Sequence, residues 1–212
     1  MFQSFPQEPV KELPDQSGKQ WAAGANGEKI VSTFLSNKLS DEWTYLRGYE
    51  NRKSEIDGIL IGTTGLFTLE IKYRRGTLIC NGDRWLIDRY DKYGNLVERL
   101  AEFQKGRSPS QQLNEPANVL EETLRRKGFA CPIFRMVVLS HEKAEIEEIK
   151  NITVDEIVVL HEWDLEKTLK KGKMNFNETE ASRIIDIIRK DHGRPVKRAE
   201  VRRPVQSSNY NL

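Results

Sequence analysis

Two apolar runs on either side of a Gly-Thr-Thr-Gly centre form the clearest pattern in the chain. They occupy residues 55–61 and 66–72, and runs of this kind joined by a short glycine-containing segment predict a β-hairpin. If residues 62–65 form the loop, Ile61 faces Leu66 and the pairing continues away from the loop in that register. We therefore expect an antiparallel pair of strands here.

This register has a consequence for three charged residues. It places Asp57 opposite Glu70, and Lys72 emerges on the same face as Glu70 because side chains alternate along a strand. Directly opposed side chains lie about 4.5–5.5 Å apart at Cβ, and like charges at that distance destabilise a sheet. A divalent cation would compensate, because hard cations take carboxylate oxygens. The alternative is a set of charged residues on a solvated face, and a one-residue slip would separate the carboxylates.

Periodicity predicts the other elements. Helical spacing favours helices at residues 21–39, 107–127, 164–171 and 178–190, and residues 141–156 are acidic and helix-prone. Strand patterns occupy residues 43–49, 77–81, 84–90, 133–139 and 157–160. The run 133–139 is continuously apolar, as in a strand buried on both faces. Ser108 can cap the helix that starts at Pro109, and Pro116 is expected to kink or restart it. Together these elements indicate an α/β fold with a mixed or largely antiparallel sheet.

Composition narrows the class of protein. The chain has 212 residues, of which 31% are charged and 37% hydrophobic, as in a globular protein with one sizeable domain. A net charge of +2 does not by itself indicate a nucleic-acid partner. Cys80 and Cys131 have no zinc-like spacing and are expected to be buried, reduced thiols. We find no signal peptide and no apolar run of about 20 residues, so we expect a cytoplasmic protein without a membrane partner.

The ends of the chain differ from its middle. Residues 1–20 contain Pro6, Pro9 and Pro14 and are expected to form a flexible arm. A single domain is predicted for residues 21–190. Residues 191–212 form a basic tail that we expect to be flexible and able to contact polyanions, although most basic tails are only solvated.

Two polar residues lie on or beside apolar helix faces. Glu28 precedes Val31 by three residues, so it shares part of that inward face, where a carboxylate needs a partner or a metal. The alternative is a first-turn glutamate that is favoured by the helix dipole. Gln112 lies at the flank of the next helix's apolar face and is a candidate site residue. Its neighbour Gln111 has a structural explanation, because it can form a capping box with Ser108.

In their order along the chain, these residues resemble a known family. The matching segments are Gly24-x-x-Gly27-Glu28, Glu55-Ile56-Asp57, Glu70-Ile71-Lys72 and Pro109-x-x-Gln112, with Gly76 and Trp85 at positions where the family tends to have these residue types. The chain resembles the nuclease-related domain (NERD) within the PD-(D/E)xK nuclease superfamily, over roughly residues 24–140. No proline precedes Asp57, although the superfamily's name includes one. Each motif alone is weak, and the ordered set is the specific signal.

The resemblance implies a restriction-endonuclease-like core, with a mixed central β-sheet flanked by helices, and metal-dependent cleavage of DNA with Mg²⁺ or Mn²⁺. It suggests Asp57, Glu70 and the backbone carbonyl of Ile71 as metal ligands, with Glu28 at the metal directly or through water. Lys72 would orient or help deprotonate the attacking water and stabilise charge on the phosphate. Gln112 would complete the catalytic set.

A basic rim around such a site is a further expectation. Tyr73, Arg74 and Arg75 follow Lys72 directly and could contact a phosphate backbone, together with Arg47, Arg52 and Lys53. Ordinary surface charge explains any one of them equally well. His141 has no ligand spacing and is left unassigned. The second hypothesis for the whole protein is a non-catalytic module that binds nucleic acid or a partner protein in a DNA repair or defence complex.

Overall fold

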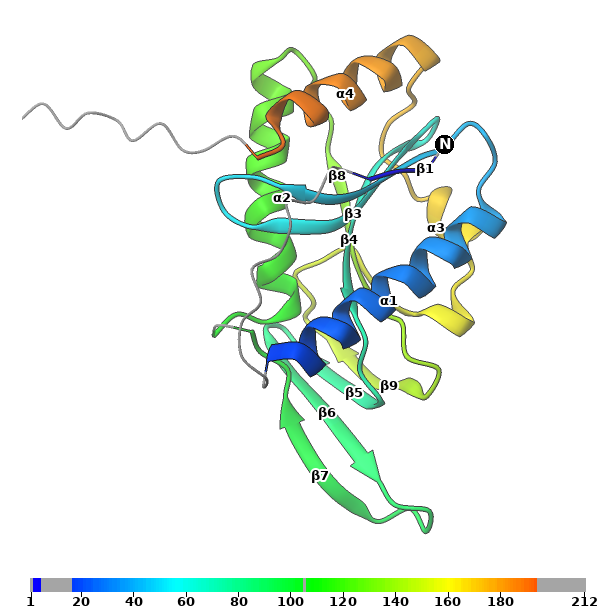
Figure 1. The fold of residues 1–212 in the computed structure, drawn as a ribbon, viewed down its shortest axis with the longest axis vertical. Helices are drawn as coiled ribbons and strands as arrows, with labels where there is room; N and C mark the ends of the chain where they lie inside the picture. The colour runs from blue at the N-terminus through cyan, green and yellow to red at the C-terminus, as the bar shows by residue number, and fades with distance from the viewer. Residues whose placement is uncertain (1, 5–16, 105, 194–212) are drawn as a thin grey trace, which may run out of the picture.

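The strands form two mixed β-sheets within residues 2–4, 17–104 and 106–193, which the computed structural model describes (Figure 1). The six-stranded sheet has the order β1 (Phe2–Ser4), β2 (Thr44–Glu50), β3 (Glu55–Gly62), β4 (Gly65–Lys72), β8 (Ile133–Leu139) and β10 (Glu156–Val159). The four-stranded sheet has the order β7 (Leu96–Ala101), β6 (Arg84–Tyr90), β5 (Gly76–Asn81) and β9 (Ala144–Lys150). The expectation of an α/β fold with helices around a mixed central sheet is confirmed.

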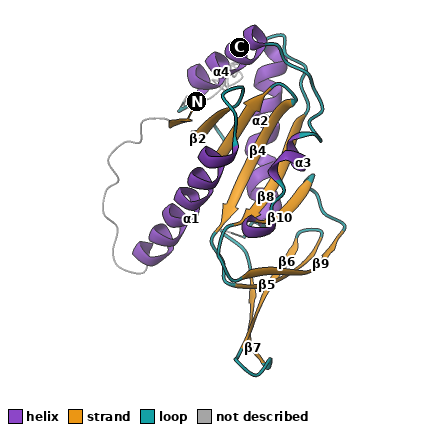
Figure 2. Cartoon of the chain, turned by 90° about the vertical axis from the view of Figure 1, so that its right-hand side faces the viewer, coloured by secondary structure: helices purple, strands orange, loops and turns teal. Residues whose placement is uncertain are grey.

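Helices cover both faces of the six-stranded sheet. They are α1 (Ser17–Lys38), α2 (Pro109–Arg126), α3 (Leu165–Leu169) and α4 (Glu178–Asp191), with a short 3₁₀ helix, η1 (Leu160–Glu162). On one face, α1 and the segment around α3 bury a core that includes Leu35 and Leu60. On the other face, α2 and α4 bury a core that includes Leu120, Ile184 and Ile59 (Figure 2). Alternate residues of one strand therefore belong to different cores.

The strand β8 shows this division directly. It lies between β4 and β10 and pairs in parallel with both. Val137 faces the α2 core, whereas Met136 and Val138 face the α1 core. The prediction of a strand buried on both faces is confirmed.

The central hairpin has the predicted register. Ile61 pairs with Leu66, and the ladder continues to Gly58 opposite Leu69. The glycine at position 65 has φ +142°, a conformation that few other residues adopt, so the sequence centre is suited to the tight turn. The hairpin therefore places the start of β3 beside the end of β4.

The four-stranded sheet was not foreseen as a separate sheet. The predicted strands 77–81 and 84–90 exist, but they pair with β7 and β9 rather than extending the central sheet. The helix-prone assignment of residues 141–156 is wrong, because Ala144–Lys150 form β9, which pairs in parallel with β5. Ile146 and Ile149 pack against the α2 core, so burial of these side chains overrides the acidic composition.

The start of α2 joins the two sheets. The hydroxyl of Ser108 accepts a hydrogen bond from the backbone N–H of Gln111 and donates one to Asp83 in the β5–β6 turn. Gln111 completes the predicted capping box, which is confirmed. The buried indole N–H of Trp85 on β6 donates to the hydroxyl of Ser110 at 3.0 Å. The helix continues through Pro116 as one element, so the expected restart does not occur.

Both ends of the described chain contact β2. Within the segment expected to be a flexible arm, β1 pairs in parallel with β2, and α1 already begins at Ser17. At the other end, the hydroxyl of Tyr49 donates to Asp191 at 2.6 Å and the backbone N–H of Glu50 donates to His192. Residues 5–16 and 194–212, which carry most of the predicted arm and tail, lie outside the described residues. None of the described helices is long and apolar enough to cross a membrane.

Candidate active site

Asp57, Glu70 and Lys72 meet where β3 begins and β4 ends. The ladder between these strands stops at Gly58, and the carboxylate of Asp57 accepts the N–H of Ile71 at 2.7 Å in place of a backbone partner. The ammonium of Lys72 lies 2.6 Å from Oε1 of Glu70. The side chains of Glu70 and Lys72 are only 6% and 11% exposed. Two carboxylates thus share the neighbourhood of one buried cation.

Gln112 on α2 holds the other side of Lys72. Its Oε1 accepts a hydrogen bond from Lys72 Nζ at 2.9 Å, and its Nε2 donates to the carbonyl of Arg107, also at 2.9 Å. The second bond fixes which end of the amide faces the lysine, because only the oxygen can accept. Lys72 is therefore held between a strand residue and a helix residue.

The pKa values of Asp57 and Lys72 are both shifted by their surroundings. Burial raises the pKa of Asp57 well above its ordinary value, and the charge of Glu70 raises it further, against the opposing effects of Lys72 and the Ile71 N–H. Burial would lower the pKa of Lys72, but Glu70 and Asp57 outweigh that effect and keep it above its ordinary value. Lys72 is thus held in its charged form, and with Asp57 and Glu70 both ionised the site would carry more negative charge than Lys72 neutralises.

Glu28 lies on α1, on the other face of the sheet. Its carboxylate forms an ion pair with Arg47 on β2 at 3.2 Å, and its side chain is 24% exposed. Glu28 is close enough to add to the electrostatic potential at Asp57. The expected partner of this helix residue is therefore an arginine here, and its contact with a metal stays a prediction.

The residues after Lys72 have separate contacts. Tyr73 packs against His141, with ring centroids 4.8 Å apart. Arg74 forms an ion pair with Glu102 at 2.6 Å. Arg75 is exposed. Of these three, Tyr73 and Arg75 present accessible side-chain surface beside the candidate site, and Arg74 is held by an acid that follows β7.

Arg52 and Lys53 belong to the β2–β3 loop. Arg52 pairs with Glu122 on α2 at 3.1 Å, with both side chains more than 40% exposed. The backbone N–H of Lys53 donates to the side chain of Asn51. These contacts are with the loop and the second half of α2, so they do not group the two residues with Lys72.

Three neighbours of the site were not predicted. Ser140 donates its N–H to the carbonyl of Lys72 at 3.0 Å, Glu102 pairs with Arg74, and His141 packs on Tyr73. Sequence spacing could not reveal them, because β8 and β7 reach this place through tertiary pairing. Among these neighbours, only the close approach of α1 had a signal in the sequence, which is Gly27. A Cβ there would lie 2.8 Å from Ser140 Oγ and 3.0 Å from Tyr73 Cβ, so glycine permits the close approach of α1.

The donor set for a metal is small. Across residues 2–4, 17–104 and 106–193, no group of three or more His, Cys, Asp or Glu side chains is arranged to hold a metal ion. At the candidate site the donors are the carboxylates of Asp57 and Glu70 and the predicted carbonyl of Ile71. Oxygen donors with excess negative charge are the kind of set that hard divalent cations take, usually with water completing the shell.

Comparison with known protein families shows to which family the chain belongs. The family model for the nuclease-related domain matches residues 23–140. The chain belongs to the NERD family. Comparison with curated proteins gave no match, and comparison with solved structures gave none either.

The NERD match covers the candidate site. It begins within α1 and ends directly after β8, so it includes Glu28, Asp57, Glu70, Lys72 and Gln112. The strands β9 and β10 and the helices α3 and α4 lie beyond it. This later part of the NERD protein contributes one strand to each sheet and covers the core, but it supplies none of the five side chains just named.

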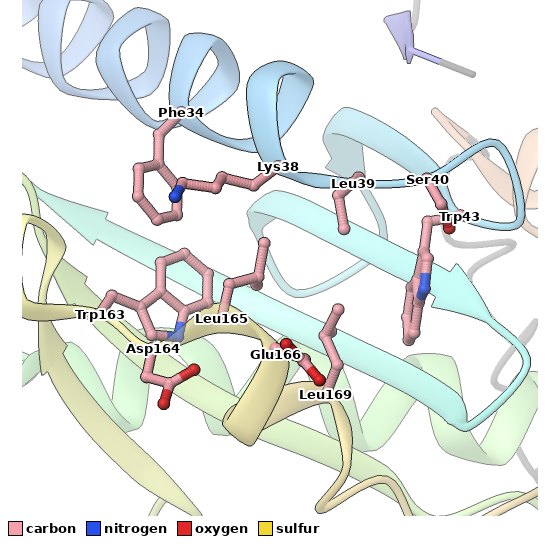
Figure 3. A pocket seen from close by; sticks show the side chains of 10 residues that line it. All are labelled: Phe34, Lys38, Leu39, Ser40, Trp43, Trp163, Asp164, Leu165, Glu166 and Leu169. Carbon is pink, nitrogen blue, oxygen red and sulfur yellow. The ribbon is translucent and has the colours of Figure 1, made fainter.

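A hollow of about 390 Å³ lies elsewhere, between α1 and α3 (Figure 3). Phe34 and Trp163 stack beside it with ring centroids 5.4 Å apart. Its two acids already stabilise α3, since Asp164 caps the helix and Glu166 pairs with Lys170 at 2.6 Å. This hollow is lined by side chains that serve packing and capping, and it shares no residue with the candidate site of the NERD domain.

Proposed function

We propose that this NERD protein is a metal-dependent DNA nuclease that hydrolyses phosphodiester bonds at Asp57, Glu70 and Lys72. The observation that carries the proposal is the buried carboxylate of Glu70 and the partly buried carboxylate of Asp57 around one lysine. Strong pKa perturbation by burial together with a specific charged neighbour is characteristic of catalytic sites. The family's nuclease-related character supports the same conclusion.

The acids suit a divalent cation, either Mg²⁺ or Mn²⁺. Asp57 and Glu70 would hold it with the carbonyl of Ile71, and Glu28 would contribute directly or through water. When bound, such an ion makes water more acidic and neutralises charge on phosphate oxygens. The ordering of Asp57 by the Ile71 N–H keeps its carboxylate at the end of β4, beside Glu70.

Lys72 supplies the positive charge for the phosphate. In the metal-free protein its pKa lies above the ordinary value, so it is a hydrogen-bond donor and a cation there. With a cation on the two carboxylates, it would also orient the attacking water or help to deprotonate it. Its ammonium would stabilise negative charge that develops on the phosphate, which is the most effective use of a preorganised cation. Gln112 is a positioning residue, since it contacts Lys72 and is itself anchored to the carbonyl of Arg107.

The test is a cleavage assay on single-stranded, linear duplex and supercoiled DNA with Mg²⁺, with Mn²⁺ and with a chelator. The wild type should cut with metal and stop with the chelator. Lys72→Met keeps the length of the side chain without its charge, and cleavage should fall by about 100-fold or more. Mn²⁺ binding, measured by titration calorimetry, should remain because the lysine is not a ligand.

Lys167→Ala is the matched control, because it removes one exposed lysine from α3. It should cut as fast as the wild type. A wild type that is inert on all three DNA forms with both metals would refute the nuclease assignment. DNA or partner binding that is indifferent to metal and to Lys72 would instead support the non-catalytic module.

A further inference from the structure

Two aromatic side chains form a step beside the candidate site. Tyr73 directly follows Lys72 at the end of β4, and His141 follows Ser140 just after β8. Their ring centroids are 4.8 Å apart and the ring planes are inclined by 46°. Both residues are only partly buried. We call this pair the aromatic step.

The aromatic step is fixed from three sides. The N–H of Ser140 donates to the carbonyl of Lys72, which ties the two strand ends together. Nδ1 of His141 accepts the backbone N–H of Lys143 at 3.0 Å, which fixes the imidazole. Gly27 brings the backbone of α1 against Tyr73 and Ser140. A preorganised surface of this kind loses little conformational entropy when a ligand binds.

Basic residues flank the aromatic step. Arg75 and Lys143 are exposed and are close enough to lower the pKa of His141, which burial lowers first and Glu142 opposes. Neither cation forms an ion pair with another residue of the described chain. The ring of His141 is therefore neutral at pH 7, beside positive charge that can attract phosphates. Aromatic faces next to cations are the usual means of holding single-stranded nucleic acid, since every base has a face that can stack.

We propose that the aromatic step stacks an unpaired base of the strand bound at Lys72, so that the protein prefers single-stranded or frayed DNA to closed duplex. This inference rests on the proposed function, because it places the substrate strand at that lysine. Tyr73 adjoins Lys72 with about 3.8 Å between Cα atoms, but its Cβ lies against Gly27 of α1, whereas Lys72 meets Gln112 of α2. The aromatic step would therefore take the base of a nucleotide that continues past the end of β4 from the phosphate at Lys72. In closed duplex the bases are stacked on one another and cannot also stack on Tyr73.

The test measures binding without catalysis. A DNA oligonucleotide with one 2-aminopurine base is added to the full chain in the presence of a chelator, as a single strand and as a closed duplex hairpin. We expect tighter binding of the single strand, with quenching of the 2-aminopurine fluorescence by stacking. Tyr73→Leu removes the ring, and its affinity for the single strand should fall by about 5- to 150-fold. Tyr73→Phe is the matched control and should keep both affinity and quenching.

His141→Leu should weaken single-strand binding in the same direction, and thermal melting of each variant checks that it is folded. Equal affinity of Tyr73→Leu and Tyr73→Phe would overturn the inference, because the rings would then serve packing alone. Equal wild-type affinity for the two DNA forms, or no binding to either, would overturn it as well. A protein that shows the Tyr73-dependent preference but never cleaves DNA would refute the nuclease and keep the stacking site, so the two failures are distinguishable.

Discussion

Each sheet holds a buried carboxylate beside a basic side chain, and the two places differ in their balance of charge. In the four-stranded sheet, Asp88 has no exposed side-chain surface and receives Arg99 through both of its oxygens, at 2.6 and 2.5 Å. In the six-stranded sheet, Asp57 and Glu70 share the single cation Lys72. One acid has one base in the first place, and two acids compete for one base in the second.

The pKa values record this difference. The hydrogen bonds from Arg99 hold the pKa of Asp88 below its ordinary value, so its charge stabilises the fold. The pKa of Asp57 is raised by burial and by Glu70, so its charge opposes folding. An unfavourable charge of this kind is typical of functional sites, which are commonly not optimised for stability. The contrast separates a structural ion pair from the site that we propose binds a cation.

The sharpest way to break this comparison is Asp57→Asn. The amide oxygen can still accept the Ile71 N–H, but the charge is lost. If Asp57 is a metal ligand, as we propose, DNA cleavage should fall by about 100-fold or more. Stability should rise at neutral pH in the presence of chelator, by about 1 kcal/mol, or roughly 2–4 °C in the melting temperature. Calorimetry and the cleavage assay measure the two effects on one preparation.

Asp41→Asn removes one exposed carboxylate and serves as the control for Asp57→Asn. It should change neither cleavage nor melting temperature by a measurable amount. If Asp57→Asn lowers the melting temperature, the charge of Asp57 is already compensated in the free protein, and the contrast between the two sheets fails.

Asp88→Asn should have the opposite effect. It removes the charge that Arg99 binds through two hydrogen bonds, so the melting temperature should fall by several degrees while cleavage at saturating DNA stays unchanged. Because the folded-state pKa of Asp88 is depressed, its contribution is present above the unfolded pKa of about 3.9 and is lost as the pH falls through the lower folded value.

A pH series of melting temperatures tests this sign. The deficit of Asp88→Asn relative to wild type should be constant near neutrality. It should shrink below about pH 4, where the wild-type carboxyl becomes protonated in the unfolded state first, and vanish below the lower folded-state pKa. A deficit that grows as the solution is acidified would contradict the lowered pKa and remove the basis of the comparison.

The smallest expected signal comes from the two thiols, Cys80 on β5 and Cys131 just before β8. Both are buried, and burial raises each pKa to about 11, so at pH 7.5 the thiolate fraction is about two orders of magnitude below that of an ordinary thiol. Labelling by a thiol reagent should be slow and equal at the two positions in the folded protein. Faster labelling of Cys80 would show that the four-stranded sheet opens independently.

Features that depend on residues close together in the sequence could be predicted from it. The glycines and apolar runs of the central hairpin gave its register, and Ser108 with Gln111 gave the capping box. The convergence of Asp57 and Glu70 followed from that register. The position of Gln112 against Lys72 agreed with its place at the flank of the helix's apolar face.

Features that depend on contacts between distant parts of the chain could not be predicted from the sequence. The strand β9 alternates glutamate and isoleucine irregularly and becomes a strand because β5 offers a parallel edge. All of β7 is exposed, so its apolar residues follow no buried face that a pattern could reveal. Glu102 reaches Arg74 only because the hairpin of β6 and β7 returns to the end of β4. Glu28 faces Arg47 because α1 covers the opposite side of the sheet.

The parallel pairing of β4 with β8 has a consequence for the time course of folding. Leu66 of β4 pairs with Ile133 of β8. Along the chain, the strands β5, β6 and β7 and the helix α2 come between these two paired strands. Closing so long a segment costs entropy before any contact repays it, and such non-local pairings form slowly. Lys72 receives its support from Ser140 and Gln112 only after that closure. The charged group around Lys72 therefore forms late in folding, and Lys72 of a nascent chain lacks these contacts until synthesis has passed β8.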